Sequence, residues 1–310
     1  MLTVLFATRN GAKTLPAVLE AYRALESPQG GWHLVVVDNG STDESRKIIA
    51  SFEDRLPLTY VFEPKVGKNT ALNAGLALIS GDLVALTDDD TFPRPDWLIR
   101  LREAADSHPT FGIFAGTILP RWETSPPAWI LNWVHLAPSY ALTDSSLTEG
   151  PTDGYHVFGP NMTVRADVFQ AGHRFDPTIG PTSSRSYPMG SETEFTLRMT
   201  KQGVTAWFTP AATVEHFVRI KQMQCSWLMG RAERLGRGQC RLGIARPPYA
   251  RLRCLGIPLH LLYRIARLSV AIPVAMLLSD QEKLFHRRWA LSYVYGYALE
   301  ARACRKSVTR

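Results

Sequence analysis

The sequence predicts an α/β fold built on a mostly parallel central sheet with flanking helices. Over roughly the first 90 residues, short apolar runs alternate with segments of helical pattern. The runs are almost continuously apolar, as in strands that are covered on both faces. Polar and acidic residues directly follow several of them, at the edge where open sheets of this kind bind ligands.

Four apolar runs predict the parallel strands. Each is short, and turn-forming or polar residues follow it. The runs are LTVLFA at 2–7, HLVVV at 33–37, LTYVF at 58–62 and LVALT at 83–87.

The segments between these runs predict helices. The first begins at Leu15 behind a capping Thr14 and ends near Leu25. The second covers about 43–53, with acidic residues in its first turn. The third lies in GKNTALNAGLALIS, where leucines and isoleucine recur at helical spacing.

The pattern after residue 92 is less regular. Residues 93–107 predict a helix, and FGIFAGTIL predicts a strand. Residues 120–158 are rich in Pro, Trp and Ser without a period, so we expect irregular structure over a substrate site. Residues 192–202 predict another helix, and VTAWF and ATVEHF predict two short strands.

Charge is unevenly distributed along the chain. The formal net charge is +7, and the stretch from Arg231 to Arg310 holds many arginines and few acids. A basic excess favours an anionic partner such as a nucleotide or an anionic membrane surface. Nucleic acid is disfavoured, because no motif of nucleic-acid-binding proteins is present and the arginines lie among apolar residues.

Residues 255–279 are strongly apolar but contain arginines and prolines. Only about twelve uncharged residues follow Arg267, fewer than the ~20 that span a bilayer. The segment therefore predicts an interfacial or re-entrant helix with its arginines at the headgroups. A buried core helix is the alternative.

The two ends of the chain carry further expectations. The N-terminal apolar run is too short for the core of a signal peptide and no basic region precedes it, so we expect the catalytic part in the cytoplasm. All four cysteines lie in the C-terminal third without a CxxC pair, which favours free thiols in a reducing compartment.

Three aspartates, Asp88 to Asp90, follow the fourth predicted strand in LVALTDDDTF. Adjacent carboxylates repel one another, so they need a counter-charge. A divalent cation held by carboxylate and phosphate oxygens would supply it. A solvated turn with capping aspartates is the alternative.

Two other acidic sites accompany this run. Asp38 ends the second predicted strand, where it could accept hydrogen bonds from a base or ribose or could form a simple turn. Glu192 and Glu194 lie in GSETEF before a helix. They could complement the helix dipole, or one of them could serve as a general base.

Several common catalytic motifs are absent from the sequence. TRNGAKT after the first strand has too few glycines for a dinucleotide-binding or phosphate-binding loop. There is no serine nucleophile elbow and no HExxH motif. The position of the aspartate run at a strand end favours the divalent-metal interpretation over a solvated turn.

Five segments in order resemble the family 2 glycosyltransferases with the GT-A fold, which are inverting nucleotide-sugar transferases. The resemblance covers roughly residues 2–220. The matching segments are LFATRNGAKTL, VVVDNGSTDES, VGKNTALNAGLALISGDLVALTDDDTFPRPDWL, FGPNMTVRADVFQAGHRFDPTIG and GSETEFTLRMTKQG. It implies a Rossmann-like catalytic domain at 1–220 and a basic, apolar helical region at 221–310 that can associate with a membrane.

The resemblance also implies roles for particular residues. Asp90 takes the metal-binding position of the family's DxD motif, with Mg²⁺ or Mn²⁺ as the ion, and His216 resembles a histidine that can reach this metal. Asp38 resembles the aspartate that contacts the nucleobase. The donor site as a whole comprises Thr8, Asn10, Asp38, Lys68, Asn73, Asp88 and Asp89.

The general base is the point where this chain departs from the family pattern. The family usually has Gly-Glu-Asp where this chain has GSETEF. Counting back from Arg198 places Glu192 at the position of the base, with Ser191 before it. We therefore expect Glu192 as base and Glu194 as its neighbour or substitute.

The implied reaction moves a sugar from a nucleotide-diphosphate donor to a hydroxyl of a glycan or lipid-linked acceptor. The basic C-terminal region then predicts a peripheral position on the inner face of the cell membrane. Two alternatives remain open: a sugar-phosphate nucleotidyltransferase, and a non-catalytic nucleotide-sugar-binding or membrane scaffold protein of the same fold.

Overall fold

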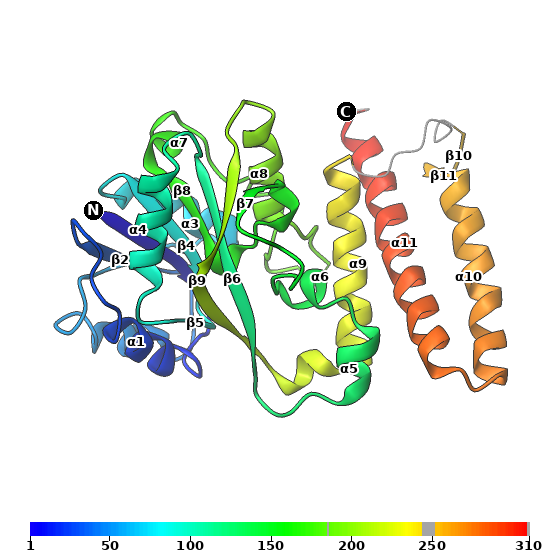
Figure 1. Ribbon diagram of the computed structural model, residues 1–310. Helices are drawn as coiled ribbons and strands as arrows, with labels where there is room; N and C mark the ends of the chain where they lie inside the picture. Colours follow the sequence, from blue (N-terminus) through cyan, green and yellow to red (C-terminus); the bar gives the residue numbers. More distant parts are fainter. Residues whose placement is uncertain (185, 244–251, 309–310) are drawn as a thin grey trace. The chain divides into compact units, whose positions relative to one another are not determined.

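The computed structural model describes residues 1–184, 186–243 and 252–308, and it divides into two compact units (Figure 1). Unit 1 comprises residues 1–121, 140–177 and 191–217. Unit 2 comprises residues 122–139, 178–190 and 218–310. Each unit is described by itself.

A nine-stranded sheet forms the centre of unit 1, in the order β3-β2-β1-β4-β8-β6-β9-β5, with β7 paired to β9. The strands are β1 (Leu2–Thr8), β2 (Trp32–Asp38), β3 (Leu58–Phe62), β4 (Leu83–Asp88), β5 (Thr91–Pro93), β6 (Ile113–Trp122), β7 (Gly150–Thr152), β8 (Met162–Arg165) and β9 (Ala206–Val218).

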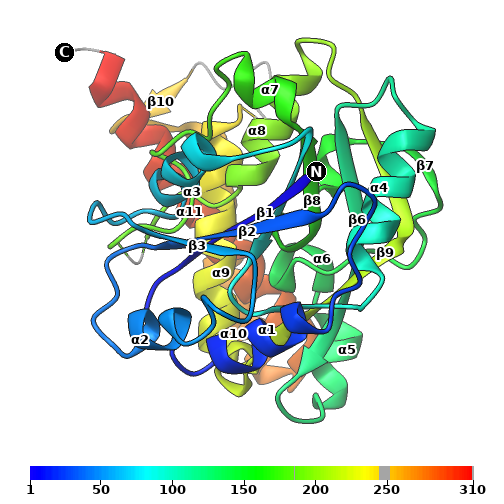
Figure 2. The ribbon, with the colours of Figure 1, turned by 90° about the vertical axis from the view of Figure 1, so that its left-hand side faces the viewer.

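The first four strands form the parallel half of the sheet. β1 pairs in parallel with β2 and with β4, and β2 pairs in parallel with β3. Figure 2 shows β1, β2 and β3 running side by side. β1 and β4 are buried almost throughout and β2 is buried from Leu34 onward, whereas β3 is only partly buried. The α/β sheet that the sequence predicts is confirmed.

The other strands make the sheet mixed. β8 runs antiparallel to β4 and to β6, and β9 runs antiparallel to β5 and β7. The sequence predicts two short strands around Pro210, but the structure has a single strand, β9. β9 pairs with β7 before Pro210 and with β5 after it. The apolar pattern of the sequence is interrupted around Pro210, although the strand itself continues.

Helices flank the sheet, and the helices that the sequence predicts before residue 110 and over 192–202 are among them. They are α1 (Leu15–Arg23), α2 (Ser45–Ala50), α3 (Lys68–Gly75), α4 (Trp97–Ser107), α7 (Ala166–Gln170) and α8 (Ser191–Thr200). Leu72 and Leu76 pack in the core cluster with Leu5 and Val37. A Cβ at Gly75 would lie 2.4 Å from a methyl of Leu5, so this glycine lets α3 approach the sheet.

The region from 120 to 158 contains more regular structure than its sequence predicts. It includes α5 (Ala128–Trp133), α6 (Leu136–Tyr140) and β7. These elements have three to six residues each, which is too short for a hydrophobic period to show in the sequence.

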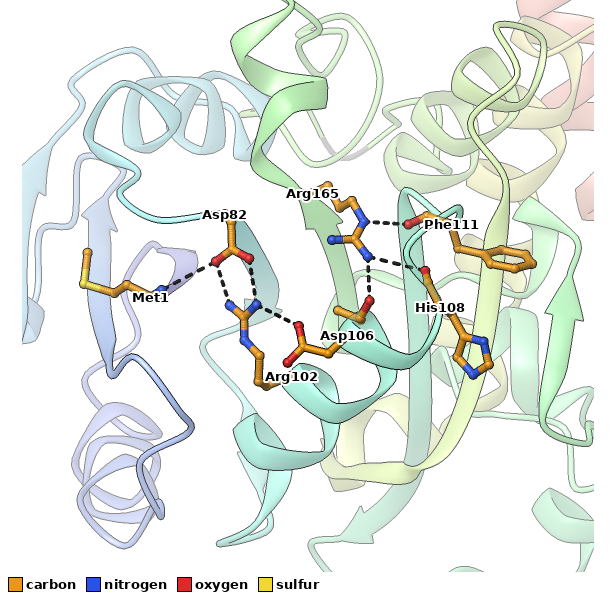
Figure 3. Close-up of polar contacts among 8 residues, drawn as sticks. Met1, Asp82, Arg102, Asp106, His108, Phe111 and Arg165 are labelled. Atoms are coloured by element: carbon orange, nitrogen blue, oxygen red, sulfur yellow. Dashed lines mark hydrogen bonds and ion pairs between the residues drawn. The ribbon is translucent and has the colours of Figure 1, made fainter.

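An ion-pair network joins the start of β4 to α4 (Figure 3). Arg102, whose side chain is 10% exposed, donates to both oxygens of Asp82 at 2.7 Å and to Asp106 at 3.3 Å. The N-terminal ammonium lies 3.5 Å from Asp82. Arg165, at the end of β8, donates to the backbone carbonyls of Phe111, Ala105 and His108. These contacts secure the sheet at the edge opposite the carboxyl ends of β1 and β4.

Unit 2 contains three long helices, α9 (Cys225–Arg241), α10 (Leu259–Leu277) and α11 (Gln281–Val308). α11 packs against both α9 and α10, as Figure 1 shows. Gly236 and Gly296 lie at the α9–α11 contact, where a Cβ on either would lie 2.0 Å from a backbone oxygen of the other helix. The four cysteines are free thiols, as the sequence predicts.

α10 is apolar and mostly exposed. It is one helix that is long and apolar enough to cross a membrane by length and composition, and only 11% of its most apolar window is buried. The alternative of a buried core helix is therefore not what the described structure contains.

Replacing Asp82 by Asn should lower the free energy of unfolding by about 1–2 kcal/mol at pH 7, because the buried Arg102 loses a charged partner. Hydrogen bonding from Arg102 lowers the pKa of Asp82 to about 2, from an ordinary value of 3.8. Because the pKa of Asp82 is lowered in the folded state, its carboxylate stabilises the fold at pH values above its ordinary pKa. This stabilisation is lost as the pH falls from about 4 toward 2. Urea unfolding of both proteins should show their difference shrinking over that range. A difference that stays constant with pH would contradict this account.

Candidate active site

The carboxyl ends of β1, β2 and β4 bring three polar side chains to one edge of the sheet. Thr8 is in register with Asp38, and the neighbouring Ala7 is in register with Asp88. Thr8 and Asp38 are buried, at 2% and 1% exposure. The structure therefore places these residues where the strand ends in the sequence predict.

Each of the three consecutive aspartates has a different partner. An Asp88 oxygen lies 2.6 Å from the Lys68 ammonium. Asp89 accepts a hydrogen bond of 2.5 Å from the Thr8 hydroxyl. Asp90 lies 3.3 Å from Nε2 of His216. Separate partners explain how three like charges can follow one another at the end of a core strand.

His216 has a fixed orientation. It lies on β9 in register with Thr91 of β5, which directly follows Asp90. Its Nδ1 is 2.6 Å from the carbonyl oxygen of Tyr140, and because a carbonyl only accepts, Nδ1 carries the hydrogen. Nε2 therefore faces Asp90. Burial lowers the pKa of His216, but the Asp90 carboxylate outweighs burial and the net direction is upward.

Asp88, Asp90 and His216 form a group that could hold a cation. One ligand atom from each lies within 4.8 Å of the others. Two carboxylate oxygens and one imidazole nitrogen suit a divalent ion such as Mn²⁺ or Mg²⁺. The fixed Nδ1 hydrogen leaves Nε2 for the ion, as in most histidine metal ligands. The donor set therefore fits a divalent metal.

Glu192 reaches the same site from the first turn of α8. Its Oε1 lies 2.9 Å from Lys68, and its Oε2 accepts a hydrogen bond of 2.9 Å from the Ser191 hydroxyl. Burial raises the pKa of Glu192, but the Lys68 charge and hydrogen bond outweigh it and leave the pKa lowered. Glu192 is thus an ionised carboxylate at neutral pH.

Lys68, at the start of α3, bridges Asp88 and Glu192. Burial disfavours its charged form, but the Asp88 and Glu192 carboxylates raise the pKa of Lys68 above its ordinary value. The side chain is 18% exposed. Lys68 is therefore a permanent positive charge between the aspartate run and the candidate base.

Glu194 has a separate environment from Glu192. It forms two hydrogen bonds with Arg198, of 2.7 and 3.0 Å, one turn later on α8. Pairs at this spacing stabilise a helix. The structure thus groups Glu192 with Lys68 and Asp88, and leaves Glu194 in a structural ion pair.

Two residues expected at the donor site connect the loops beside it. Asp38 accepts hydrogen bonds from the backbone N–H of Ser41 and from the Tyr60 hydroxyl. Asn10 accepts a hydrogen bond of 2.8 Å from the backbone N–H of Thr42, and its φ of 56° is left-handed. Both therefore shape the loops that follow β1 and β2.

Asn73 holds the backbone of a distant loop. Its amide donates to the carbonyl of Phe175 at 2.8 Å and accepts from the N–H of Phe175 at 3.0 Å. Asn69 donates to the carbonyl of Asp176 at 2.8 Å. In this structure the polar atoms of Asn73 are thus used in supporting the site.

Sequence reasoning missed three supporting residues. A Cβ at Gly11 would lie 2.4 Å from the Thr8 hydroxyl and 2.8 Å from Asp89, and a Cβ at Gly159 would lie 2.5 Å from Glu192. Asn39 donates to the carbonyls of Glu63 and Lys65 and accepts from the N–H of Gly67. These bonds hold the loop that leads to Lys68. Glycine in NGAK and FGP was a signal for the first two, whereas the Asn39 contacts carry no local signal.

The arrangement offers two chemical functions in one place. A carboxylate–imidazole group can hold a divalent ion, and an ionised Glu192 can accept a proton. The Lys68 ammonium connects the two. Such a site suits the transfer of a group from a diphosphate to a hydroxyl.

Two solved structures have similar folds. The mannosyltransferase PcManGT from Pyrobaculum calidifontis, in complex with GDP-Man and Mn²⁺, aligns with a TM-score of 0.63 and 21% identity, over 98% of this chain and 87% of its own. TarS from S. aureus, residues 1–349 in complex with UDP, aligns with a TM-score of 0.56 and 15% identity, over 99% and 91% of the two chains. These likenesses show the GT-A fold.

Proteins with sequences similar to this chain include enzymes named as glycosyltransferases. One is a glucosyl-dolichyl phosphate glucuronosyltransferase from Haloferax volcanii, which is 23% identical over 71% of this chain and 68% of its own. The profile of Glycosyl transferase family 2 matches residues 3–173, which is more than half of the chain. The chain therefore belongs to Glycosyl transferase family 2 and is a glycosyltransferase.

Proposed function

We propose that this enzyme transfers a sugar from a nucleotide-diphosphate sugar to a hydroxyl of a glycan or lipid-linked acceptor, with inversion at the anomeric carbon. The observation that carries the proposal is the grouping of Glu192 with Lys68 and Asp88, beside Asp90 and His216. It supports the proposal because a carboxylate that could accept a proton lies near carboxylate and imidazole groups that could bind a cation.

The relatives support the substrate classes. The Pyrobaculum mannosyltransferase is described with GDP-Man and Mn²⁺, and the Haloferax enzyme acts on a glucosyl-dolichyl phosphate. A nucleotide-sugar donor and a lipid-linked acceptor are therefore the first substrates to test. Membrane-borne acceptors would place the enzyme at the inner face of the cell membrane.

Glu192 is assigned as the general base. Its ionised carboxylate takes the proton of the acceptor hydroxyl as the hydroxyl oxygen bonds to the anomeric carbon. The bond from that carbon to the diphosphate oxygen breaks, and the electron pair leaves with the nucleoside diphosphate. A single displacement of this kind inverts the configuration and needs no sugar–enzyme intermediate.

We assign stabilisation of the leaving diphosphate to Asp88 and Asp90, together with His216. Asp90 and His216 would hold Mg²⁺ or Mn²⁺, with Asp88 beside them. When bound, the ion neutralises charge that develops on the leaving diphosphate. Lys68 lies close enough to Asp88 to add a second positive charge on that side.

The donor site is assigned to residues at the ends of β1, β2 and β4 and the start of α3. Asp38 takes the nucleobase side and Asp88 the ribose and sugar side. Thr8 orients Asp89 through the hydrogen bond between them. The full set is Thr8, Asn10, Asp38, Lys68, Asn73, Asp88 and Asp89. We keep residues 1–220 as the catalytic domain and 221–310 as the membrane-associated region.

A panel of UDP-, GDP- and dTDP-sugars should identify a donor from which the enzyme releases free nucleoside diphosphate when a divalent ion is present. Release should increase with an acceptor hydroxyl, and the product should carry the inverted anomeric configuration by NMR. A nucleotidyltransferase would instead release pyrophosphate from a nucleoside triphosphate, and a non-catalytic scaffold would release neither. Retention of configuration would contradict the single displacement.

Glu192→Gln should reduce kcat by about 10²–10⁴-fold while donor affinity stays near that of wild type, because the amide cannot accept the proton. Glu194→Gln is the matched comparison on the same turn of α8. It should lose only its pair with Arg198 and keep most of the turnover. Initial rates and calorimetric donor binding would measure both. The assignment fails if Glu194→Gln is the variant that loses turnover.

Asp90→Asn should abolish metal-dependent binding of the nucleoside diphosphate, because the neutral amide is a poor ligand for a hard cation. Asp89→Asn is the matched change one residue earlier, and it should weaken donor binding without removing the metal dependence. Calorimetry with and without Mn²⁺ would compare the two. Equal metal dependence in wild type and Asp90→Asn would rule out Asp90 as a ligand.

A further inference from the structure

The outward face of α10 is apolar along its whole length. We call Leu259, Tyr263, Val270, Val274 and Leu277 the outer stripe of α10. They recur at spacings of three, four and seven residues, so they share one face. All are exposed, and Val270 and Leu277 are 70% and 85% exposed. A surface helix of a soluble protein carries polar residues on this face.

The inward face of the same helix is also apolar. Leu261 is buried in the cluster that α10 shares with α11, and Ile265 and Leu268 pack against that cluster. Arg287 of α11 donates to the carbonyl of Ala271, which adds a polar contact between the helices. The inward face is thus occupied within unit 2, and the outer stripe needs a different apolar environment.

Arginines flank the outer stripe. Arg264 and Arg267 are exposed, and neither has an ion-pair partner among the residues that the structure describes. No acid occurs anywhere in residues 259–277. Exposed arginines beside an apolar stripe suit a surface whose apolar layer lies below a layer of negative charge.

A second copy of this chain fits the same face poorly. A two-fold contact through the outer stripe would bring the arginines of both copies to one interface. Since α10 has no acid to pair with them, the arginines would repel. An anionic lipid surface removes this repulsion because its headgroups supply the negative charge.

We propose that the outer stripe of α10 docks on an anionic membrane, with the helix lying in the plane of the interface. The stripe contacts acyl chains, and Arg264 and Arg267 contact lipid phosphates. The ten residues from 268 to 277 are uncharged and span about 15 Å, half of a hydrocarbon core of about 30 Å. Packing on α11 also keeps one face of the helix away from lipid.

Exposed leucines extend the docking surface beyond both ends of the helix. Leu278 is 72% exposed, and Leu252 and Leu255 are 70% and 81% exposed. Arg253 lies between the last two and donates to the carbonyl of Gly256. The surface thus continues the alternation of apolar residues and arginines seen on α10.

The docking surface adds a membrane-binding site to the proposed function. It rests on that function only in assuming that the acceptor is lipid-linked. Binding to the membrane and transfer of the sugar are measured separately. A failure to bind vesicles would overturn the docking surface and leave the donor chemistry standing. A failure to release nucleoside diphosphate would overturn the proposed donor chemistry and leave the docking surface standing.

The test is co-sedimentation of the full chain with vesicles of phosphatidylcholine, alone or mixed with phosphatidylglycerol. Wild type should bind the anionic vesicles and bind less as salt is raised. Val270→Glu should lower the partition coefficient by tenfold or so, since it places a charge at the centre of the stripe. The double variant Arg264→Gln/Arg267→Gln should lose a similar factor on anionic vesicles and little on neutral ones.

Ile220→Glu makes the same chemical change at another exposed position, 51% exposed and outside the stripe, and should bind as wild type does. Circular dichroism would check that every variant folds. Equal binding of Val270→Glu and wild type would overturn the proposal. So would a wild-type dimer in sedimentation velocity that Val270→Glu dissociates, because a second copy would then cover the stripe. Alkaline carbonate should release the bound protein, and retention would contradict the in-plane arrangement.

Discussion

The ammonium of Lys68 holds together the two sides of the active site. Its partners, Asp88 and Glu192, come from the end of β4 and the start of α8, and Glu192 lies 124 residues along the chain from Lys68. Without a cation between them these partly buried carboxylates would repel each other. The Lys68 charge also lowers the pKa of Glu192, which the proposed function uses as the proton acceptor. These contacts link the start of α3 to the end of β4 and to the start of α8.

Each aspartate in the run from Asp88 to Asp90 has its own partner. Thr8 donates to Asp89 through a neutral hydroxyl, whereas Asp88 pairs with the Lys68 ammonium and Asp90 lies beside the His216 imidazole. The three carboxylates are therefore chemically distinct although adjacent in the sequence. Under the proposed function, this distinction lets one short turn contact the donor, bind the cation and hold the loop.

Sequence reasoning predicted the parallel half of the fold because its strands are continuous apolar runs. The positions of Asn10, Asp38 and Asp88 to Asp90 just after predicted strands also indicated that they lie at one edge of the sheet. The antiparallel half was harder, since strands of three residues such as β5 and β7 have no readable period. The bridging by Lys68 and the use of Asn73 on the Phe175 backbone are contacts over more than 100 residues, which no local pattern encodes. The pairing of Glu194 with Arg198 was readable from its spacing of four residues.

The central claim is that this edge of the sheet holds a divalent ion with ligands from both β4 and β9. Pulsed electron paramagnetic resonance of Mn²⁺ bound with nucleoside diphosphate tests it most directly. The account predicts a nitrogen coupling from one coordinated histidine, present in wild type and absent in His216→Gln. Mn²⁺ bound through oxygen alone in the wild-type enzyme would contradict it.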